Sequence, residues 1–111
     1  MKRGDIWIVN LDPGFGRELH KKRPALIVSK NLINQETSSV IIIPISSQVP
    51  QIVGPEMIIL HMDAGVERTS VLLPLFIRSI DQARLVKKIG GLPTKLMNDV
   101  EDAIKLVLDL T

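Results

Sequence analysis

Five short apolar stretches separated by turn-forming residues constrain the fold of this 111-residue chain most strongly. They are rich in Val, Ile and Leu, and Gly, Pro, Asn or Asp stands near their ends, as is typical of β-strands. None of the connections between them carries the long helical pattern that a parallel crossover needs. The sequence therefore predicts a mainly β fold, either an antiparallel sheet or a small barrel. The five stretches are residues 5–11, 24–29, 39–46, 56–62 and 69–74.

Two of these stretches and the segment between them carry further local information. Residues 24–29 contain a continuous apolar run, which predicts a strand buried on both faces. Pro44 has no N–H to donate to a sheet ladder, so we expect it where its strand meets an edge or a bulge. Residues 31–38 have the composition of a loop.

The last third of the chain has helical periodicity. Residues 81–88 predict a short helix with Asp81 near its start and basic residues at its end, and the glycines of 89–92 break it. Pro93 and Thr94 then open a longer helix that packs on the sheet by one apolar stripe. The stripe consists of Leu96, Met97, Val100, Ala103, Ile104, Val107 and Leu108.

Length and composition predict one domain spanning residues 1–111. A hydrophobic fraction of 45% is typical of a folded protein, and this length supports one core. The longest apolar run, residues 40–45, is far shorter than the ~20 residues of a membrane-spanning helix, and no signal peptide is recognisable. Without cysteine, neither a disulfide nor a Cys-ligated metal is possible. We therefore expect a cytoplasmic protein with no membrane segment.

Positive charge is concentrated near the N-terminus. Residues 1–30 contain seven Lys/Arg and three Asp/Glu, a sum of +4, whereas residues 31–111 contain seven and nine, a sum of −2. Such a segment suits a polyanion such as RNA, although an ordinary solvated surface has the same composition.

Arg23 ends the basic cluster directly before an apolar strand. Pro24 favours extended backbone at the residue before it, so Arg23 is held at the edge of a sheet. Its guanidinium is always charged and presents five N–H donors that suit phosphate oxygens. Glu18, five residues earlier, is a candidate partner that would orient this group, and a simple surface Arg–Glu pair is the alternative interpretation.

Ser46 and Ser47 follow the apolar run of the third predicted strand. A hydroxyl at the end of a strand often caps a turn. Alternatively, it lies at the rim of the sheet beside Arg23 and completes a phosphate-sized site.

Other kinds of site have little support in the sequence. His20 and His61 lie in different elements, and no spacing of His, Cys and carboxylates marks a metal site. Two histidines could serve as an acid–base pair for RNA cleavage, but nothing places them together. The glycines of residues 14–16 lack the rest of a dinucleotide-binding motif and are assigned to a turn.

Several segments taken together resemble the MazF/PemK toxins of bacterial toxin–antitoxin pairs. The match runs in order, with compatible spacing, through nearly the whole chain. The segments are residues 3–5 followed by a strand, Gly16-x-Glu18, 23–29, 44–47, 78–85 and 89–90.

The resemblance implies a small SH3-like antiparallel β-barrel with a C-terminal helix, working as a homodimer. It implies a metal-independent, sequence-selective endoribonuclease without a cofactor. The substrate would be single-stranded RNA, chiefly mRNA, cut to 2′,3′-cyclic phosphate and 5′-hydroxyl ends. The protein partner would be a MazE-like antitoxin whose acidic, largely disordered C-terminal segment becomes ordered on a basic groove.

The same resemblance assigns roles to individual residues. Arg23 is the catalytic arginine, Ser46 the catalytic hydroxyl and Glu18 the supporting acid. Arg3 is expected at the rim of the RNA site. The other RNA-contacting candidates are Phe15, Arg17, Lys21, Lys22, Ser47, Phe76 and Arg78.

Two positions depart from the family pattern. Ser46 stands where Thr is usual and lacks the methyl group that stiffens χ1. Phe76, two residues before Arg78, stands where Gln is usual, and it can stack on a base but cannot hydrogen-bond its edge. Two alternative functions are therefore still possible. One is a degenerate homologue that binds RNA without cutting it. The other is a CcdB-like inhibitor of DNA gyrase with the same barrel, although the basic cluster favours the nuclease.

Overall fold

The computed structural model describes residues 1–14, 16 and 21–110, and it begins with a tight turn that starts the first strand. Gly4 has φ +95°, a conformation that glycine adopts without strain, and its N–H and C=O bond Ile27 O and Leu92 N. The strands are β1 Asp5–Asn10, β2 Lys22–Ile27, β3 Ser39–Ser46, β4 Ile58–Leu60, β5 Ser70–Leu72, β6 Arg78–Asp81 and β7 Leu85–Gly91. The helices are α1 Asn31–Glu36 and α2 Thr94–Leu108, with single 3₁₀ turns η1 Met62–Ala64, η2 Pro74–Phe76 and η3 Gln82–Arg84.

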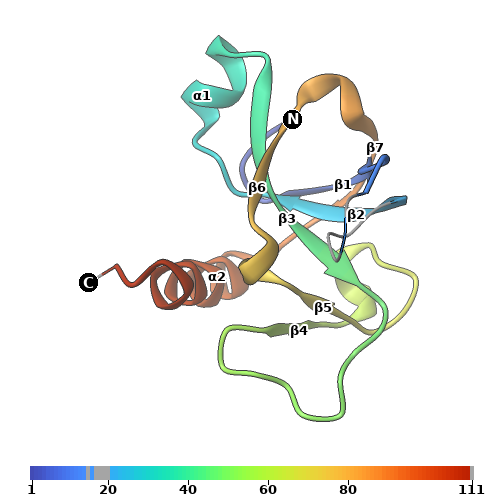
Figure 1. Ribbon diagram of the computed structural model, residues 1–111, viewed down its shortest axis with the longest axis vertical. Coiled ribbons are helices and arrows are strands. Elements are labelled where there is room, and N and C mark those ends of the chain that lie inside the picture. Colours follow the sequence, from blue (N-terminus) through green and yellow to red (C-terminus); the bar gives the residue numbers. More distant parts are fainter. Residues whose placement is uncertain (15, 17–20, 111) are drawn as a thin grey trace.

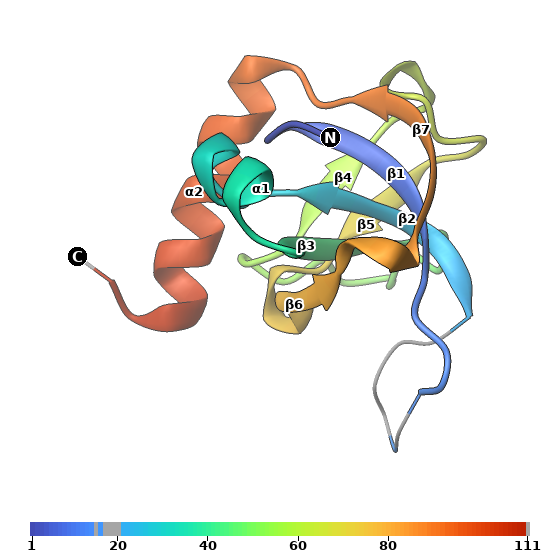
Figure 2. The ribbon, with the colours of Figure 1, turned by 90° about the horizontal axis from the view of Figure 1, so that it is seen from above.

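Within the described residues, these strands form one curled antiparallel sheet with α2 along one side (Figures 1 and 2). The order is β4-β5-β3-β2-β1-β7, and β6 also pairs with β3. The long strand β3 changes partner along one of its edges, because its first half pairs with β6 and its last two residues pair with β5. The prediction of a small antiparallel β-barrel with a C-terminal helix is confirmed.

Pro44 lies where β3 changes partner. Ile42 is the last residue paired with β6, and Ile45 is the first paired with β5. The Pro44 carbonyl accepts the Leu73 N–H at 3.0 Å, so the missing proline N–H faces the edge where the pairing changes. The proline therefore costs the sheet little at this position.

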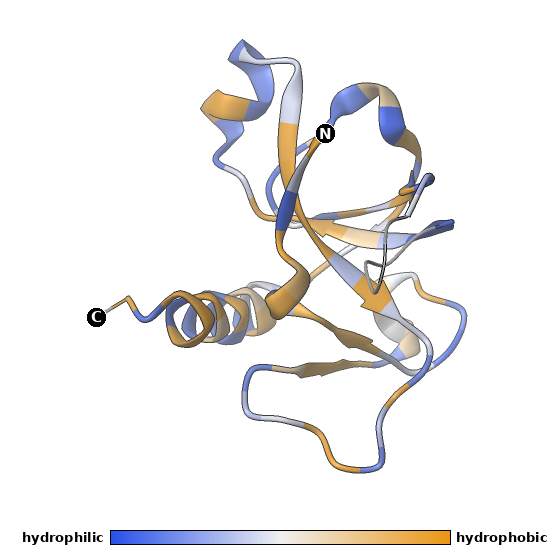
Figure 3. Cartoon of the chain, viewed as in Figure 1, coloured by the Kyte–Doolittle hydropathy of each residue, from blue (hydrophilic) through white to orange (hydrophobic). Residues whose placement is uncertain are grey.

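Apolar side chains form two buried clusters, and α2 covers one of them. The first cluster joins Ile6, Leu26 and Ile43 of three adjacent strands to Met97 and Val100 of α2. Figure 3 shows that α2 has an apolar and a polar side, as the predicted stripe requires. The second cluster comprises Val9, Leu11, Ala25, Ile27, Val40, Ile42 and Ile80, with Trp7 and Leu85 against it.

The prediction of a loop at residues 31–38 is wrong for its first part, which forms α1. The buried Asn34 side chain exchanges hydrogen bonds with Ser29. Gln82 Nε2 donates to the carbonyls of Asn34 at 2.8 Å and Thr37 at 2.9 Å. Because a glutamine 48 residues away from Asn34 satisfies the end of this short helix, local composition did not reveal it.

The helix predicted at residues 81–88 is also wrong. Asp81 does cap a helical turn, because its carboxylate accepts the Ala83 N–H at 2.8 Å, but the turn is the single 3₁₀ turn η3. The chain then continues as strand β7, which pairs with β1. Two predicted strands are also shorter than expected, since residues 56–62 reduce to β4 and 69–74 to β5.

Two glycines bring the edges of the curled sheet together. Gly65 follows η1, just after edge strand β4, and Gly90 lies in edge strand β7. A Cβ atom on Gly90 would lie 2.1 Å from the Ala64 carbonyl oxygen, and one on Gly65 would lie 2.4 Å from the Ile89 carbonyl oxygen. The glycines at 89–92 therefore permit close backbone contact and do not end a helix.

Candidate active site

Arg23 and Ser46 come from the neighbouring strands β2 and β3. The two strands pair as Ala25 with Pro44, Leu26 with Ile43 and Ile27 with Ile42. Continuing this antiparallel register by two residues places Arg23 opposite Ser46. Opposite residues of an antiparallel pair project from the same face of the sheet. The fold thus brings the two principal candidate residues to one face, where both are half-buried.

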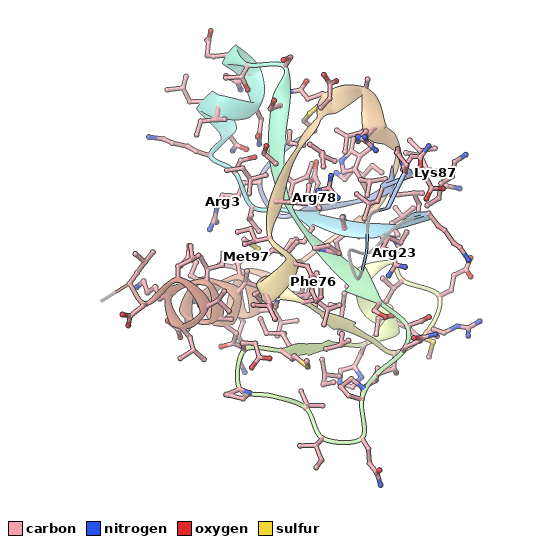
Figure 4. The ribbon with its side chains drawn as sticks, in the orientation of Figure 1. Arg3, Arg23, Phe76, Arg78, Lys87 and Met97 are labelled. Carbon is pink, nitrogen blue, oxygen red and sulfur yellow. The ribbon has the colours of Figure 1, made fainter. Side chains whose placement is uncertain are left out.

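Arg78 belongs to the same face. It pairs with Ile42 across β3 and β6, and Ile42 is four residues before Ser46, an even number of positions along the strand. Arg23 itself pairs with Val9 of β1 on its other side. The same face of the sheet also carries fully buried apolar residues such as Val9 and Ile42, which hold the strands in position. Figure 4 shows the two arginines over the β2–β3 part of the sheet.

The Ser46 hydroxyl caps a turn, and its role at a phosphate stays a prediction. Its oxygen accepts the Gln48 N–H at 3.1 Å, which is the turn-capping bond. A hydroxyl that accepts one hydrogen bond can still donate its own proton to another group. The turn therefore orients Ser46 without using its donor, and Ser47 follows it as an exposed residue.

Lys21 and Lys22 lie at the start of β2, next to Arg23, and both are exposed. Lys22 pairs with Asn10 of β1. Lys21 has φ +70°, a left-handed conformation that costs a non-glycine residue about 1–2 kcal/mol. Its N–H donates to Asp12 Oδ1 at 2.7 Å and its C=O accepts the Leu11 N–H at 2.9 Å, so both backbone groups are satisfied.

Phe76 lies in η2, half-buried and two residues before Arg78. Its backbone N–H donates to the Leu73 carbonyl at 2.9 Å, which holds the turn that leads into β6. The aromatic ring is therefore carried by the segment that also delivers Arg78 to the site face.

Arg3 lies apart from these residues. Its guanidinium forms an ion pair with Glu101 of α2 at 2.8 Å and donates to the Val28 carbonyl at 3.1 Å. Arg3 precedes β1, whereas Arg23 pairs with Val9 near the far end of that strand. Figure 4 shows the two arginines on different sides of the protein. Within one chain, the structure does not bring Arg3 to the Arg23 site.

Three candidates, Phe15, Arg17 and Glu18, lie outside the described residues, as does His20. Their assigned roles stay predictions. Among the described residues, no three His, Asp or Glu side chains gather closely enough to hold a metal ion. No helix in the described part of the chain is long and apolar enough to cross a membrane.

Sequence reasoning missed the contacts of Arg84 and Lys88. Arg84 Nη1 donates to the carbonyls of Asn10 at 3.0 Å and Asp12 at 2.7 Å, where β1 leaves the sheet. Lys88 was assigned to a helix end, but its ammonium lies 3.3 Å from Asp5 Oδ1. All three contacts join residues more than 70 positions apart, so no local pattern could indicate them.

Asp5 anchors the turn that starts β1. Burial acts to raise the pKa of its carboxyl group, but the Lys2 N–H at 2.8 Å and the Lys88 ammonium outweigh burial. The pKa of Asp5 is therefore lower in the folded protein than its ordinary value.

This lowered pKa predicts a stability change in acid. The Asp5 contribution to the free energy of unfolding is present above about pH 4, the ordinary Asp pKa, and is lost as the pH falls through the folded pKa. Urea unfolding should be measured for wild type and Asp5→Asn from pH 2.5 to pH 7. The free energy of unfolding should fall less steeply toward acid pH in the variant. Asp102→Asn, which changes an exposed carboxylate, is the control. Identical acid slopes in wild type and Asp5→Asn would contradict this account.

Fold and site together define a small β-barrel protein with a C-terminal helix and with two arginines and a hydroxyl on one face of its sheet. The chain belongs to the family of PemK-like, MazF-like toxins of type II toxin–antitoxin systems, whose model matches residues 2–108. This confirms the resemblance seen in the sequence.

Two relatives that are named endoribonucleases match this chain over most of their own length. The chain is 34% identical to Endoribonuclease EndoA of Bacillus subtilis (strain 168) over 113 residues, covering 99% of this chain and 96% of the relative. It is 31% identical to Endoribonuclease PemK of Escherichia coli, covering 97% and 82%.

Solved structures show the same fold. MazF from Deinococcus radiodurans superimposes with a TM-score of 0.87 at 24% identity, covering 98% of this chain and 96% of that one. An endoribonuclease from a mycobacterial species, solved in complex with its cognate antitoxin, superimposes with a TM-score of 0.83 at 22% identity, covering 100% and 97%.

Proposed function

We propose that this chain is the toxin of a type II toxin–antitoxin pair and acts as a metal-independent, sequence-selective endoribonuclease. Its substrate is single-stranded RNA, chiefly mRNA. Support comes from family membership and from relatives of 30–34% identity that are named endoribonucleases. The observation that carries the proposal is the β2–β3 register, which puts Arg23 and Ser46 on one face of the sheet.

The proposed reaction is an internal transesterification. The RNA 2′-oxygen attacks the adjacent phosphorus, the bond to the 5′-oxygen breaks, and negative charge builds on the non-bridging oxygens. The products carry a 2′,3′-cyclic phosphate and a 5′-hydroxyl. The reaction requires two proton transfers. The 2′-hydroxyl loses a proton when its oxygen attacks, and the leaving 5′-oxygen gains one.

Arg23 supplies the positive charge that stabilises this transition state. Its guanidinium is already protonated when RNA binds, so it is not the base that takes the 2′-proton, which passes to solvent water. Preorganised donors at the position where charge develops are usually the largest single contribution to catalysis. Arg23 is also the group suited to protonate the leaving oxygen. Ser46 donates a hydrogen bond to the same phosphate, and Glu18 is proposed as the acid that orients Arg23.

RNA approaches over the exposed lysines at the start of β2. Lys21 and Lys22 raise the local concentration of a polyanion without fixing its sequence. Phe76 contributes to base preference by stacking, since it has no amide with which to read a base edge. Arg78 adds a second cation on the Arg23 face.

The chain works as a single-domain homodimer in the cytoplasm, where mRNA is available. Its protein partner is a MazE-like antitoxin with an acidic C-terminal segment that covers the basic site. Of the solved structures with this fold, a mycobacterial endoribonuclease is in complex with its cognate antitoxin, and MazF from Deinococcus radiodurans is in complex with MazE.

Cleavage without metal tests the proposal. Purified protein is incubated with a long single-stranded RNA in excess EDTA, and the cut ends are mapped and analysed chemically. We expect cuts at a short recurring sequence, with 2′,3′-cyclic phosphate and 5′-hydroxyl ends. Intact RNA with a folded protein would contradict the proposal. Inhibition of gyrase supercoiling in the absence of RNA cutting would favour the CcdB-like alternative.

A further inference from the structure

We infer that Arg84 is a positioning residue for Arg23, acting through the backbone at the two ends of the β1–β2 connection. The inference rests on the proposed function, because it concerns the orientation of the arginine assigned to the phosphate. Arg84 does not contact Arg23 in the bonds described below. It acts on the chain segments that lead into and out of the connection.

The first step is the link from Arg84 to the end of β1. Arg84 is half-buried in η3, a turn that the Asp81 carboxylate caps by accepting the Ala83 N–H at 2.8 Å. From there, Arg84 Nη1 donates to the Asn10 carbonyl at 3.0 Å and to the Asp12 carbonyl at 2.7 Å. One nitrogen therefore fixes two alternate carbonyls at the point where β1 ends.

The second step is the link from Asp12 to Lys21. The Asp12 N–H donates to Asn10 Oδ1 at 3.0 Å, which orients the residue. Its carboxylate then accepts the Lys21 N–H at 2.7 Å, while the Leu11 N–H donates to the Lys21 carbonyl at 2.9 Å. Fixing the Asp12 backbone therefore also fixes the backbone of Lys21.

The third step is the link from Lys21 to Arg23. Lys21 has φ +70°, which is unfavourable for a residue with a side chain. The two hydrogen bonds to its backbone stabilise this conformation, and the conformation sets the direction in which Lys22 and Arg23 enter β2. When the Asp12 carboxylate moves, Lys21 is free to return to the ordinary φ range and Arg23 moves with it.

An arginine suits this task better than a lysine. The guanidinium nitrogens are held in a rigid plane, whereas an ammonium on a flexible stem fixes direction poorly. Arg84→Met removes the donors and keeps much of the apolar stem. Arg84→Lys keeps a donor that reaches the same carbonyls. The exposed Arg68 provides a matched control, because Arg68→Ala removes an equal charge and Arg68 takes part in none of these hydrogen bonds.

Steady-state cleavage of a short RNA carrying one site tests the inference. A misplacement of about 1 Å can reduce a rate about 10²-fold, so we expect Arg84→Met to lower kcat about 10- to 100-fold. KM should change less than about 2-fold, because the binding lysines remain. Arg84→Lys should recover part of kcat, and Arg68→Ala should match wild type. Wild-type kcat in a folded Arg84→Met variant would overturn the inference.

A double variant separates positioning from an independent contribution. If Arg84 acts through Arg23, then Arg23→Ala/Arg84→Met should cut no more slowly than Arg23→Ala alone. An additional 10- to 100-fold loss in the double variant would show that Arg84 acts independently, and would overturn the inference. A lower melting temperature that fully explains the loss by a smaller folded fraction would do the same.

A second measurement does not depend on cleavage. In NMR spectra, the backbone amides of Lys21, Lys22 and Arg23 should shift in Arg84→Met and stay unchanged in Arg68→Ala. If wild type cuts no RNA, the proposed function fails, and these shifts still decide whether Arg84 positions the start of β2. Unchanged amides in Arg84→Met would overturn the positioning role whatever the activity.

Discussion

Replacing Arg23 by alanine is expected to reduce kcat for RNA cleavage about 10²–10³-fold, the effect of removing a preorganised donor from a developing negative charge. Steady-state kinetics on a one-site RNA should show the loss mainly in kcat, because Lys21 and Lys22 still attract the substrate. The charge-matched control is Arg68→Ala, an exposed arginine to which no role is assigned.

The Arg23→Ala fold should be intact, so the loss can be read as chemistry. Arg23 is half-buried at the start of β2 and is not part of the core, which the fully buried residues Ala25, Leu26 and Ile27 of the same strand form. Circular dichroism and a melting curve close to those of wild type are therefore expected. A folded Arg23→Ala protein with wild-type kcat would remove Arg23 from the active site.

Gly90→Ala is expected to destabilise the protein by about 3 kcal/mol, at the upper end of the usual cost of overfilling a close contact. The new Cβ would lie 2.1 Å from the Ala64 carbonyl oxygen and 3.1 Å from Gly65 Cα. Both obstacles are backbone atoms, so no side chain can rotate away. The two edges of the curled sheet must separate to make room.

Gly91→Ala is the matched control, one position further along β7. Its Cβ would lie 3.7 Å from the Gly4 carbonyl oxygen, an ordinary van der Waals contact. Urea unfolding of both variants should show a large loss only for Gly90→Ala. Equal stability of the two variants would show that the edges of the sheet do not depend on this glycine contact.

The strands that the sequence predicted best are those that contain a continuous apolar run. Residues 39–46 form β3 as expected, and the 24–29 run lies in or beside β2, with Ala25, Leu26 and Ile27 fully buried. The apolar stripe of α2 was equally clear, because Met97 and Val100 recur at helical spacing and are buried. In these segments, local pattern and tertiary contacts favour the same structure.

The errors fall where distant residues determine local structure. Gln82 satisfies carbonyls at the end of α1, so a polar segment folds as a helix. The segment that contains Lys87 and Lys88 has charges suited to a helix end, yet it pairs with β1 as an edge strand. Backbone pairing with a strand about 80 residues away outweighed the weak helical preference.

The site shows the same division. The resemblance suggested roles for Arg23 and Ser46. That the two side chains share one face of the sheet follows from the β2–β3 register, which only the structure provides. Arg3 was expected at the rim of the RNA site, and that role stays a prediction; its ion pair with Glu101, 98 positions away, was not foreseen. The contacts of Arg84 with Asn10 and Asp12 are similarly long-range.

The most direct test is a crystal structure of the protein with a single-stranded RNA whose scissile nucleotide lacks its 2′-hydroxyl and therefore cannot be cut. One phosphate should lie within about 3 Å of both the Arg23 guanidinium and the Ser46 Oγ, on the sheet face that also carries Arg78. RNA bound to the opposite face, or Arg23 and Ser46 holding phosphates of different nucleotides, would contradict the account.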